Sequence, residues 1–182
     1  PQEIGRLTAL KILDVEHNRL TELPSTISNL KSLVIMKLGY NEIANLPDSI
    51  GGLTKLRELT IERNKISEIP KGIGKFSKLE YLNLYKNYLK SLPKEIGKLR
   101  KLRQLVLSYN QVSRIPIEIF NCDNLKQILL DENQIKKEDY AHWLKEIGFN
   151  SEYPLVEFRT KEVLSAEGRD ISWMSDYARW KE

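Results

Sequence analysis

One residue spacing constrains this chain more than any other feature: an asparagine recurs every 23 residues. The positions are Asn18, Asn41, Asn64, Asn87, Asn110 and Asn133. A second column with the same period holds Pro1, Pro24, Pro47, Pro70, Pro93 and Pro116. A fixed period of this size is typical of stacked repeats, because each unit can bury its apolar face only against its neighbours. The chain is therefore expected to fold as a solenoid.

Two apolar columns precede each asparagine and predict a short strand in every repeat. The first column holds Leu13, Met36, Leu59, Leu82, Leu105 and Ile128, and the second holds Val15, Leu38, Ile61, Leu84, Leu107 and Leu130. Because the columns are two residues apart, both side chains lie on one face of a strand. We predict strands near residues 12–16, 35–39, 58–62, 81–85, 104–108 and 127–131. They would stack into a parallel sheet, spaced about 4.7–4.9 Å apart.

The six asparagines have a structural interpretation. After each strand the chain must turn away, which leaves inward-facing backbone N–H and C=O groups without partners. A buried polar group without a hydrogen bond costs roughly 1–3 kcal/mol. An asparagine amide carries both donors and an acceptor, so it can satisfy the turns of its own and the neighbouring coil. We therefore predict an asparagine ladder along the array.

The repeat resembles the leucine-rich repeat proteins, in the class with the pattern LxxLPxxIxxL. The stretch LPKEIGKLRKLRQLVLSYNQV, residues 92–112, is similar to the lysine-rich repeat proteins abundant in pathogenic spirochaetes. Related repeats occur in Ras-associated scaffold proteins and in plant Ras-group proteins. The resemblance covers roughly residues 1–147. It implies an α/β-type solenoid, with parallel strands on the concave face, irregular or 3-10 turns on the convex face and a C-terminal helical cap.

The repeats define an array over residues 1–135. The opening PQEIGRL matches PKEIGKL at residues 93–99, so Pro1 belongs to a repeat whose strand is missing. A solenoid needs a capping unit at each end. We expect the first coil, near Leu10, Leu13 and Val15, to present an open strand edge and to self-associate unless upstream residues cover it.

The repeat pattern stops after Ile135, and residues 136–182 are predicted to form a cap and tail. Tyr140, Trp143 and Leu144 have helical spacing, which predicts a helix near residues 137–147. The segment PLVEF, residues 154–158, is consistent with a short strand, and a second helix is expected near residues 171–180. That helix would pack as more cap or serve as a docking element.

The sequence contains no recognisable catalytic or cofactor motif. Its two histidines, His17 and His142, fall about five coils apart, and its single cysteine, Cys122, aligns with the buried leucines of the repeat. We therefore expect a chain that is not an enzyme, with no cofactor and no metal site beyond a weak chance at Asp14 and Glu16. One cysteine excludes an internal disulfide and fits a reducing compartment. The spirochaete resemblance instead implies a secreted or cell-surface protein, and both locations stay open.

The strand positions that vary between repeats are the candidates for partner binding. The position just before each asparagine holds His17, Tyr40, Arg63, Lys86, Tyr109 and Glu132. Tyrosine is enriched at protein interfaces, and five of the eight tyrosines fall in the varying positions. Six strands give a platform roughly 24 Å wide. The predicted partner-binding residues are Tyr40, Arg63, Tyr81, Tyr85, Lys86, Tyr88, Tyr109, Asp131 and Glu132.

A basic segment supplies a rival surface. Residues 65–103 contain eleven Lys or Arg and three Glu. Lys71, Lys75 and Lys78 align with Lys94, Lys98 and Lys101, so they should form rows on the convex side. Such rows commonly serve solubility, and they can also attract an anionic surface.

The sequence therefore favours a non-enzymatic protein-protein interaction module that binds a protein partner through its concave face. The spirochaete resemblance implies a bacterial surface or secreted factor that engages host proteins. The alternatives are an adhesin for anionic glycans or membrane surfaces that uses the basic rows, and an intracellular scaffold of the Ras-associated type. Neither nucleic-acid binding nor membrane insertion is expected.

Overall fold

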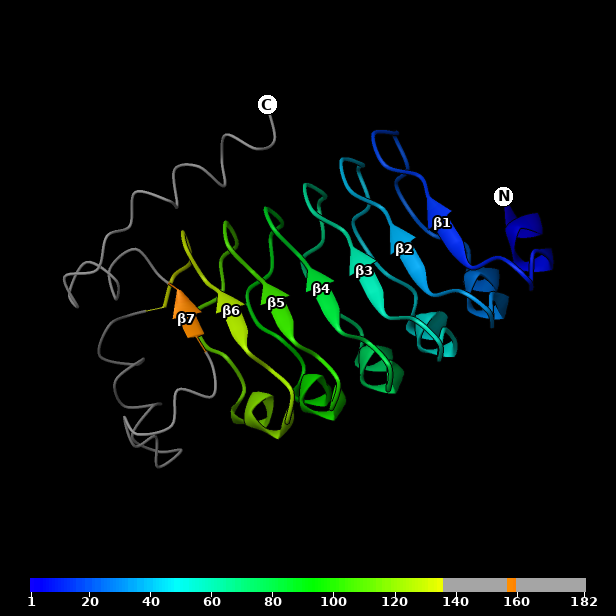
Figure 1. Cartoon of the computed structure of the whole chain (residues 1–182). Coiled ribbons are helices and arrows are strands. Elements are labelled where there is room, and N and C mark those ends of the chain that lie inside the picture. The colour runs from blue at the N-terminus through cyan, green and yellow to red at the C-terminus, as the bar shows by residue number, and fades with distance from the viewer. Residues whose placement is uncertain (136–156, 160–182) are drawn as a thin grey trace.

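The computed structural model of the chain describes residues 1–135 and 157–159. Within them, seven parallel strands form one sheet in sequence order (Figure 1). The strands are β1 Ile12–Asp14, β2 Ile35–Lys37, β3 Glu58–Thr60, β4 Tyr81–Asn83, β5 Gln104–Val106, β6 Gln127–Leu129 and β7 Glu157–Arg159. The 3-10 helices are η1 Gln2–Arg6, η2 Ser25–Asn29, η3 Asp48–Gly52, η4 Lys71–Lys75, η5 Lys94–Lys98 and η6 Ile117–Asn121. The predicted leucine-rich repeat solenoid is confirmed, with strands and 3-10 helices in separate rows (Figure 1).

Each of the first six strands begins at the expected residue and ends two residues earlier than expected. Backbone pairing nevertheless continues past the strand, since the Leu38 N–H donates to Thr60 O at 2.8 Å and the Tyr40 N–H to Glu62 O at 2.9 Å. Tyr40 has a φ of 56°, which turns the chain away from the extended conformation. The turn before the asparagine therefore sets the end of the strand.

A proline precedes each 3-10 helix from η2 to η6, in extended conformation. Pro70, for example, has φ −67° and ψ 150°. Its carbonyl accepts the N–H of Ile73 at 3.1 Å, which closes the first turn of η4. Proline suits this position because its ring fixes φ near this value and because it has no N–H that needs a partner.

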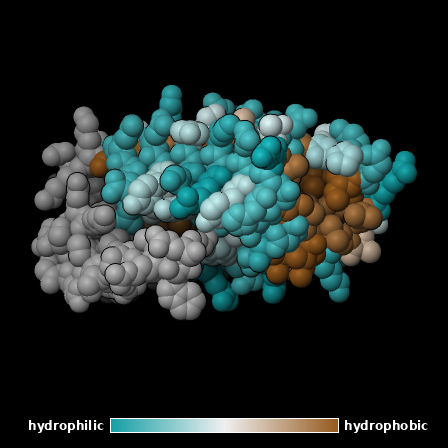
Figure 2. All heavy atoms as spheres, turned by 90° about the horizontal axis from the view of Figure 1, so that it is seen from above, coloured by the Kyte–Doolittle hydropathy of each residue, from teal (hydrophilic) through white to brown (hydrophobic). Residues whose placement is uncertain are grey.

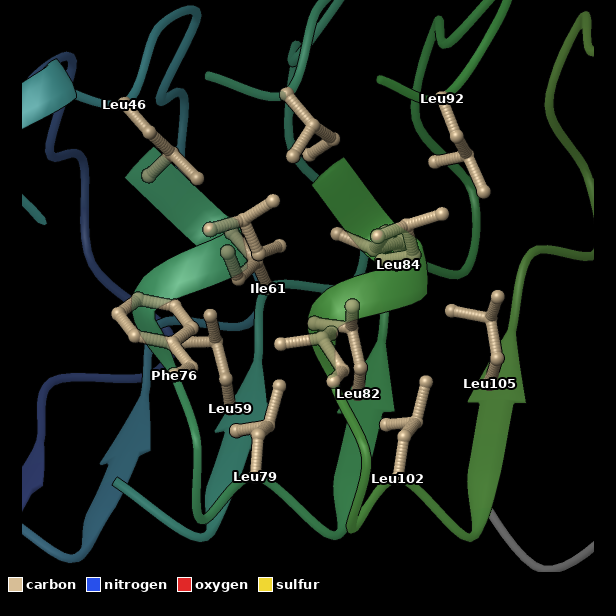
Figure 3. Packing of buried hydrophobic residues seen from close by; sticks show 14 of the residues in the cluster. Leu46, Leu59, Ile61, Phe76, Leu79, Leu82, Leu84, Leu92, Leu102 and Leu105 are labelled. Atoms are coloured by element: carbon tan, nitrogen blue, oxygen red, sulfur yellow. The ribbon is translucent and has the colours of Figure 1, made fainter. Parts of the chain in front are cut away.

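The core consists of equivalent leucines and isoleucines stacked from coil to coil (Figure 3). Leu59, Leu82 and Leu105 come from the same position of β3, β4 and β5, and each is fully buried. Phe76 follows η4, at the position that Leu53 and Leu99 occupy in the adjacent coils, and it is also fully buried. Burying one such side chain stabilises the fold by about 1.5–3 kcal/mol, so the repeated columns supply most of the driving force.

The asparagine side chains bridge neighbouring coils. The amide nitrogen of Asn64 donates to Leu38 O at 3.0 Å in the preceding coil and to Ile61 O and Glu62 O, both at 3.2 Å, in its own coil. Its amide oxygen accepts the Ile43 N–H at 2.9 Å. The same pair of cross-coil bonds is made by Asn41, Asn87, Asn110 and Asn133. Asn18, in the first coil, is exposed and bonds only to Val15 O and Glu16 O of its own coil in the described residues.

The first coil carries exposed apolar side chains. Leu7 and Ile12 are 51% and 56% exposed, and Leu13 and Val15 are only partly buried. Figure 2 shows hydrophobic side chains gathered at this end of the solenoid, whereas the rest of the described surface in that view is mostly hydrophilic. Self-association through this coil stays a prediction.

The helices expected near residues 137–147 and 171–180, and most of the predicted cap and tail, lie outside the described residues. Of this region the structure describes β7, which pairs in parallel with β6 in the register Ile128 to Phe158. No helix in the described part of the chain is long and apolar enough to span a membrane.

Candidate binding face

Six residues with positive φ lie just before the asparagines, and we call them the left-handed row. Their φ values run from 52° to 59°, and they are His17, Tyr40, Arg63, Lys86, Tyr109 and Glu132. A left-handed conformation costs roughly 1–2 kcal/mol for a residue with a Cβ. Glycine tolerates it best, asparagine, aspartate and histidine are enriched in it, and of these only His17 occurs in the row. The turn therefore imposes the conformation whichever side chain is present.

Four residues of the row, His17, Tyr40, Arg63 and Tyr109, together with Tyr85, which precedes Lys86, make a continuous series of side-chain contacts across five coils. We call this series the aromatic chain. His17 stacks on Tyr40 with ring centroids 4.2 Å apart and an interplanar angle of 19°. The Arg63 guanidinium carbon lies 5.1 Å from the Tyr40 ring centroid and 5.9 Å from that of Tyr85. Tyr85 meets Tyr109 edge to face at 5.2 Å. Exposed cation–π contacts contribute about 0.5–1 kcal/mol and aromatic pairs about 0.5–1.5 kcal/mol, so these side chains are held in place before any partner arrives.

The structure brings together four of the predicted partner-binding residues, Tyr40, Arg63, Tyr85 and Tyr109, within the aromatic chain. Lys86 is exposed in the same left-handed row. Tyr88 is 52% exposed but follows Asn87 instead of preceding it, outside the aromatic chain.

The three remaining predicted residues lie outside the aromatic chain. Tyr81 lies at the opposite end of β4, level with Gln104 of β5. Asp131 and Glu132 belong to the sixth coil, where the Asp131 carboxylate accepts a hydrogen bond from Ser108 at 3.3 Å.

His17 belongs to the aromatic chain and was missing from the predicted binding residues. The signal for it is its position, because it shares a column with Tyr40 one coil earlier. Residues in one column of neighbouring parallel strands lie about 4.8 Å apart, which is close enough for ring stacking. A search for aromatic or histidine neighbours within one column would have found it.

Several of the varying strand positions are buried in the middle of the sheet. Five of these residues are between 2% and 7% exposed: Thr60, Glu62, Asn83, Val106 and Ser108. Close strand spacing lets large side chains cover small ones on the adjacent strand. At Gly39, an added Cβ would lie 2.9 Å from the Glu62 carboxyl carbon and 3.0 Å from a Glu16 carboxylate oxygen, so these two side chains occupy the space that the glycine leaves.

The basic rows lie on the side of the 3-10 helices, on η4, η5 and the turns that follow them. All six side chains are exposed: Lys71, Lys75, Lys78, Lys94, Lys98 and Lys101. No ion pair holds any of them within residues 1–135 and 157–159. They form a second charged surface, separate from the left-handed row.

Two requirements of catalytic sites bear on the described residues, a metal-binding cluster and a reactive thiol. No group of three or more His, Cys, Asp or Glu in this part of the chain could hold a metal ion. Cys122 is buried, its Sγ lies 3.3 Å from Ile96 O, and burial raises the pKa of the thiol to about 11. Since the thiolate is the nucleophilic form, Cys122 is a core side chain and not a reactive one at neutral pH.

Comparison with sequence families agrees with the geometry. A family model for the leucine rich repeat matches residues 54–112, and one for a leucine-rich repeat region matches residues 1–68. The two matches together cover most of the described array. The chain belongs to the leucine-rich repeat proteins.

Solved structures show the same fold. A leucine-rich repeat protein of Leptospira interrogans matches with 29% identity over 87% of this chain and a TM-score of 0.57. The ectodomain of the Arabidopsis thaliana membrane receptor kinase GASSHO1/SCHENGEN3, in complex with Casparian strip integrity factor 2, matches with 34% identity over 74% and a TM-score of 0.68. A chain of the octameric complex of latrophilin 3, Unc5D and the leucine-rich repeat protein FLRT2 matches with 29% identity over 84% and a TM-score of 0.71.

The chain spans 51%, 17% and 48% of the lengths of these three structures, respectively. A search of curated proteins found no match.

Proposed function

We propose that this chain is a non-enzymatic protein-interaction module that binds its partner along the left-handed row at the edge of the concave sheet. The aromatic chain carries the proposal. Tyrosine and arginine dominate binding energy at protein interfaces, above all where their side chains are held in place before binding. Arg63, Tyr85 and Tyr109 meet that description, since ring contacts join them across neighbouring coils.

The matched structures support this class of function. Two of them are named as complexes, one of a receptor ectodomain with Casparian strip integrity factor 2 and one of FLRT2 with latrophilin 3 and Unc5D. The spirochaete resemblance of the repeats leads us to propose a bacterial surface or secreted factor that engages host proteins, and one of the matched structures is a leucine-rich repeat protein of Leptospira interrogans. The resemblance to Ras-associated scaffolds supports an intracellular partner instead, and affinity capture from host and bacterial lysates distinguishes the two.

A matched pair of tyrosines tests the site. Tyr109 is 44% exposed within the aromatic chain, and Tyr88 is 52% exposed outside it. A captured partner should bind Tyr109→Ala at least about thirtyfold more weakly than the wild type, because truncating a central tyrosine at an interface costs about 2 kcal/mol or more. Tyr88→Ala should change the affinity less than about threefold. Equal affinities for both variants and the wild type would exclude the left-handed row as the site.

The basic rows support a second candidate, an adhesin for anionic glycans or membrane surfaces. The supporting observation is the set of exposed lysines on η4 and η5 that no carboxylate neutralises in the described residues. Heparin can serve as the probe. If this surface is functional, the double variant Lys75→Glu and Lys98→Glu should abolish heparin binding at low salt, and high salt should do the same to the wild type. Tyr109→Ala should leave heparin binding unchanged.

A further inference from the structure

Arg63 is the one cation of the aromatic chain, and its environment is unusual for an exposed arginine. Its guanidinium lies between the rings of Tyr40 and Tyr85, at 5.1 Å and 5.9 Å from their centroids. The side chain is exposed, and no ion pair joins it to a carboxylate in the described part of the chain. Elsewhere in the array, Arg57, Arg100 and Arg103 each pair with an acidic residue of an adjacent coil. Arg63 is therefore held by aromatic rings and not by an ion pair.

The Arg63 side chain makes no hydrogen bond within the described residues, so its donors are available to a partner. The five N–H donors of a guanidinium lie in its plane, in a fork that matches the two oxygens of a carboxylate. The rings of Tyr40 and Tyr85 attract the guanidinium through its charge and not through these donors. The tyrosines thus restrict the rotamers of Arg63 without using its donors, which lowers the entropy lost when a carboxylate binds.

The next residue of the left-handed row adds a second cation. Lys86 is exposed, has a φ of 53°, and makes no ion pair in the described residues. Its backbone lies one strand spacing from that of Arg63, about 4.8 Å. Tyr40 precedes this pair in the row and Tyr109 follows it. The row therefore presents two adjacent positive charges with a tyrosine on each side.

We infer that Arg63 and Lys86 form the docking point for a carboxylate of the partner, an Asp or Glu side chain with apolar or aromatic neighbours that rest on Tyr40 and Tyr109. Arg63 supplies the bidentate hydrogen bonds, and Lys86 supplies a point charge beside them. A charge-assisted bidentate pair gives geometric specificity as well as energy. The inference rests on the proposed function, since it assigns the partner chemistry of the same row.

A displayed library of random short peptides tests this chemistry without a known partner. Peptides selected on the wild-type chain should be enriched in Asp or Glu next to an aromatic or aliphatic residue. Arg63→Gln should bind the selected peptides at least about tenfold more weakly, because one charge-assisted pair contributes roughly 1.5–3 kcal/mol. Arg63→Lys should also lose affinity, since lysine keeps the charge and lacks the fork. A fresh selection on Arg63→Glu should yield peptides rich in Lys or Arg.

The matched control is Lys71→Gln, which removes one positive charge from the 3-10 side, and its affinity for the selected peptides should equal that of the wild type. Thermal melting checks that every variant is folded. Selected peptides without acidic enrichment, or with equal affinity for Arg63→Gln, overturn the inference. If those peptides still lose affinity for Tyr109→Ala, the proposed function stands. Selected peptides that bind Arg63→Gln and Tyr109→Ala as tightly as the wild type, or a library that yields no binders, count against both proposals.

Discussion

The asparagine column and the left-handed row are neighbours in every repeat, yet they differ in almost every respect. The asparagine is the same in six coils, and in the inner coils it is buried and bonded to the adjacent coil. The residue before it differs from coil to coil, is mostly exposed, and has a strained φ in all six. One peptide bond therefore separates a position whose residue type the backbone fixes from a position whose side chain is free to vary.

The physical origin of this difference is the turn that ends each strand. The turn needs an amide at the asparagine position, because backbone groups of two coils lack other partners there. It also needs a left-handed residue just before the asparagine, but it makes no demand on that side chain. Structural need thus fixes the residue type in one column and only the conformation in the other. A side chain that the fold does not require can be varied to suit a partner.

The largest effect should come from removing an inner asparagine. The Asn87 amide nitrogen donates to Ile61 O at 3.0 Å and Leu84 O at 3.2 Å, and its oxygen accepts the Ile66 N–H at 3.0 Å. Asn87→Ala leaves several buried backbone groups without this partner. Each such group costs roughly 1–3 kcal/mol, so we expect a loss of about 3 kcal/mol in the free energy of unfolding, measured by urea denaturation.

The first coil provides the control. Asn18 is exposed, and its side chain bonds only within its own coil in the described residues. Water can replace those bonds, so Asn18→Ala should cost less than about 1 kcal/mol. If both substitutions had the same effect, the cross-coil bonds would not be what stabilises the asparagine column.

The next prediction, of intermediate size, concerns the buried thiol of Cys122, whose contribution to the free energy of unfolding depends on pH. Burial raises the pKa of Cys122 to about 11, above the value of about 9 that its thiol has when exposed. The unfolded state therefore loses its thiol proton first as the pH rises. The stabilisation is complete below about pH 9 and is lost as the pH approaches 11. Across this window the wild type should lose about 2 kcal/mol more than Cys122→Val, which cannot titrate. Parallel pH profiles of the two proteins would contradict a buried thiol.

The sequence predicted the solenoid because its period is enforced by burial. Every coil must present leucine or isoleucine at positions such as Leu82 and Leu105, so the pattern repeats in plain view. The left-handed row was not predictable in the same way. Its conformation comes from the turn and not from its own residues, and side chains such as those of Tyr40, Arg63 and Lys86 have no intrinsic preference for positive φ.

The candidate site was only partly accessible from the sequence for a related reason. The columns show which residues share a face, but not which side chains touch. The stacking of His17 on Tyr40 and the placement of Arg63 between two rings depend on rotamers. The burial of Thr60 and Val106 depends on the size of the side chains around them. Such features need the three-dimensional arrangement.

The smallest predicted effect is also the most direct test of the strain in the left-handed row. The substitution should stabilise the fold, whereas the substitutions above destabilise it. Lys86 is exposed with a φ of 53°, and glycine is the residue that adopts this conformation without a Cβ clash. Removing the cost of the left-handed conformation gains roughly 1–2 kcal/mol, which should exceed the conformational entropy that glycine loses on folding, roughly 0.5–1 kcal/mol. Lys86→Gly should therefore stabilise the fold by about 0.5–1 kcal/mol, seen as a higher urea midpoint.

Lys90 is the matched control, since it is exposed, lies four residues further on, and is absent from the positive-φ residues. Lys90→Gly gains no relief of strain and should destabilise the fold by about 0.5–1 kcal/mol. Both variants lose one positive charge, so the difference between them isolates the backbone term. If Lys86→Gly destabilised the fold as much as Lys90→Gly, the row would not be strained. If it stabilised the fold while weakening the binding of acidic peptides, residue 86 would be a position where recognition is maintained at the expense of stability.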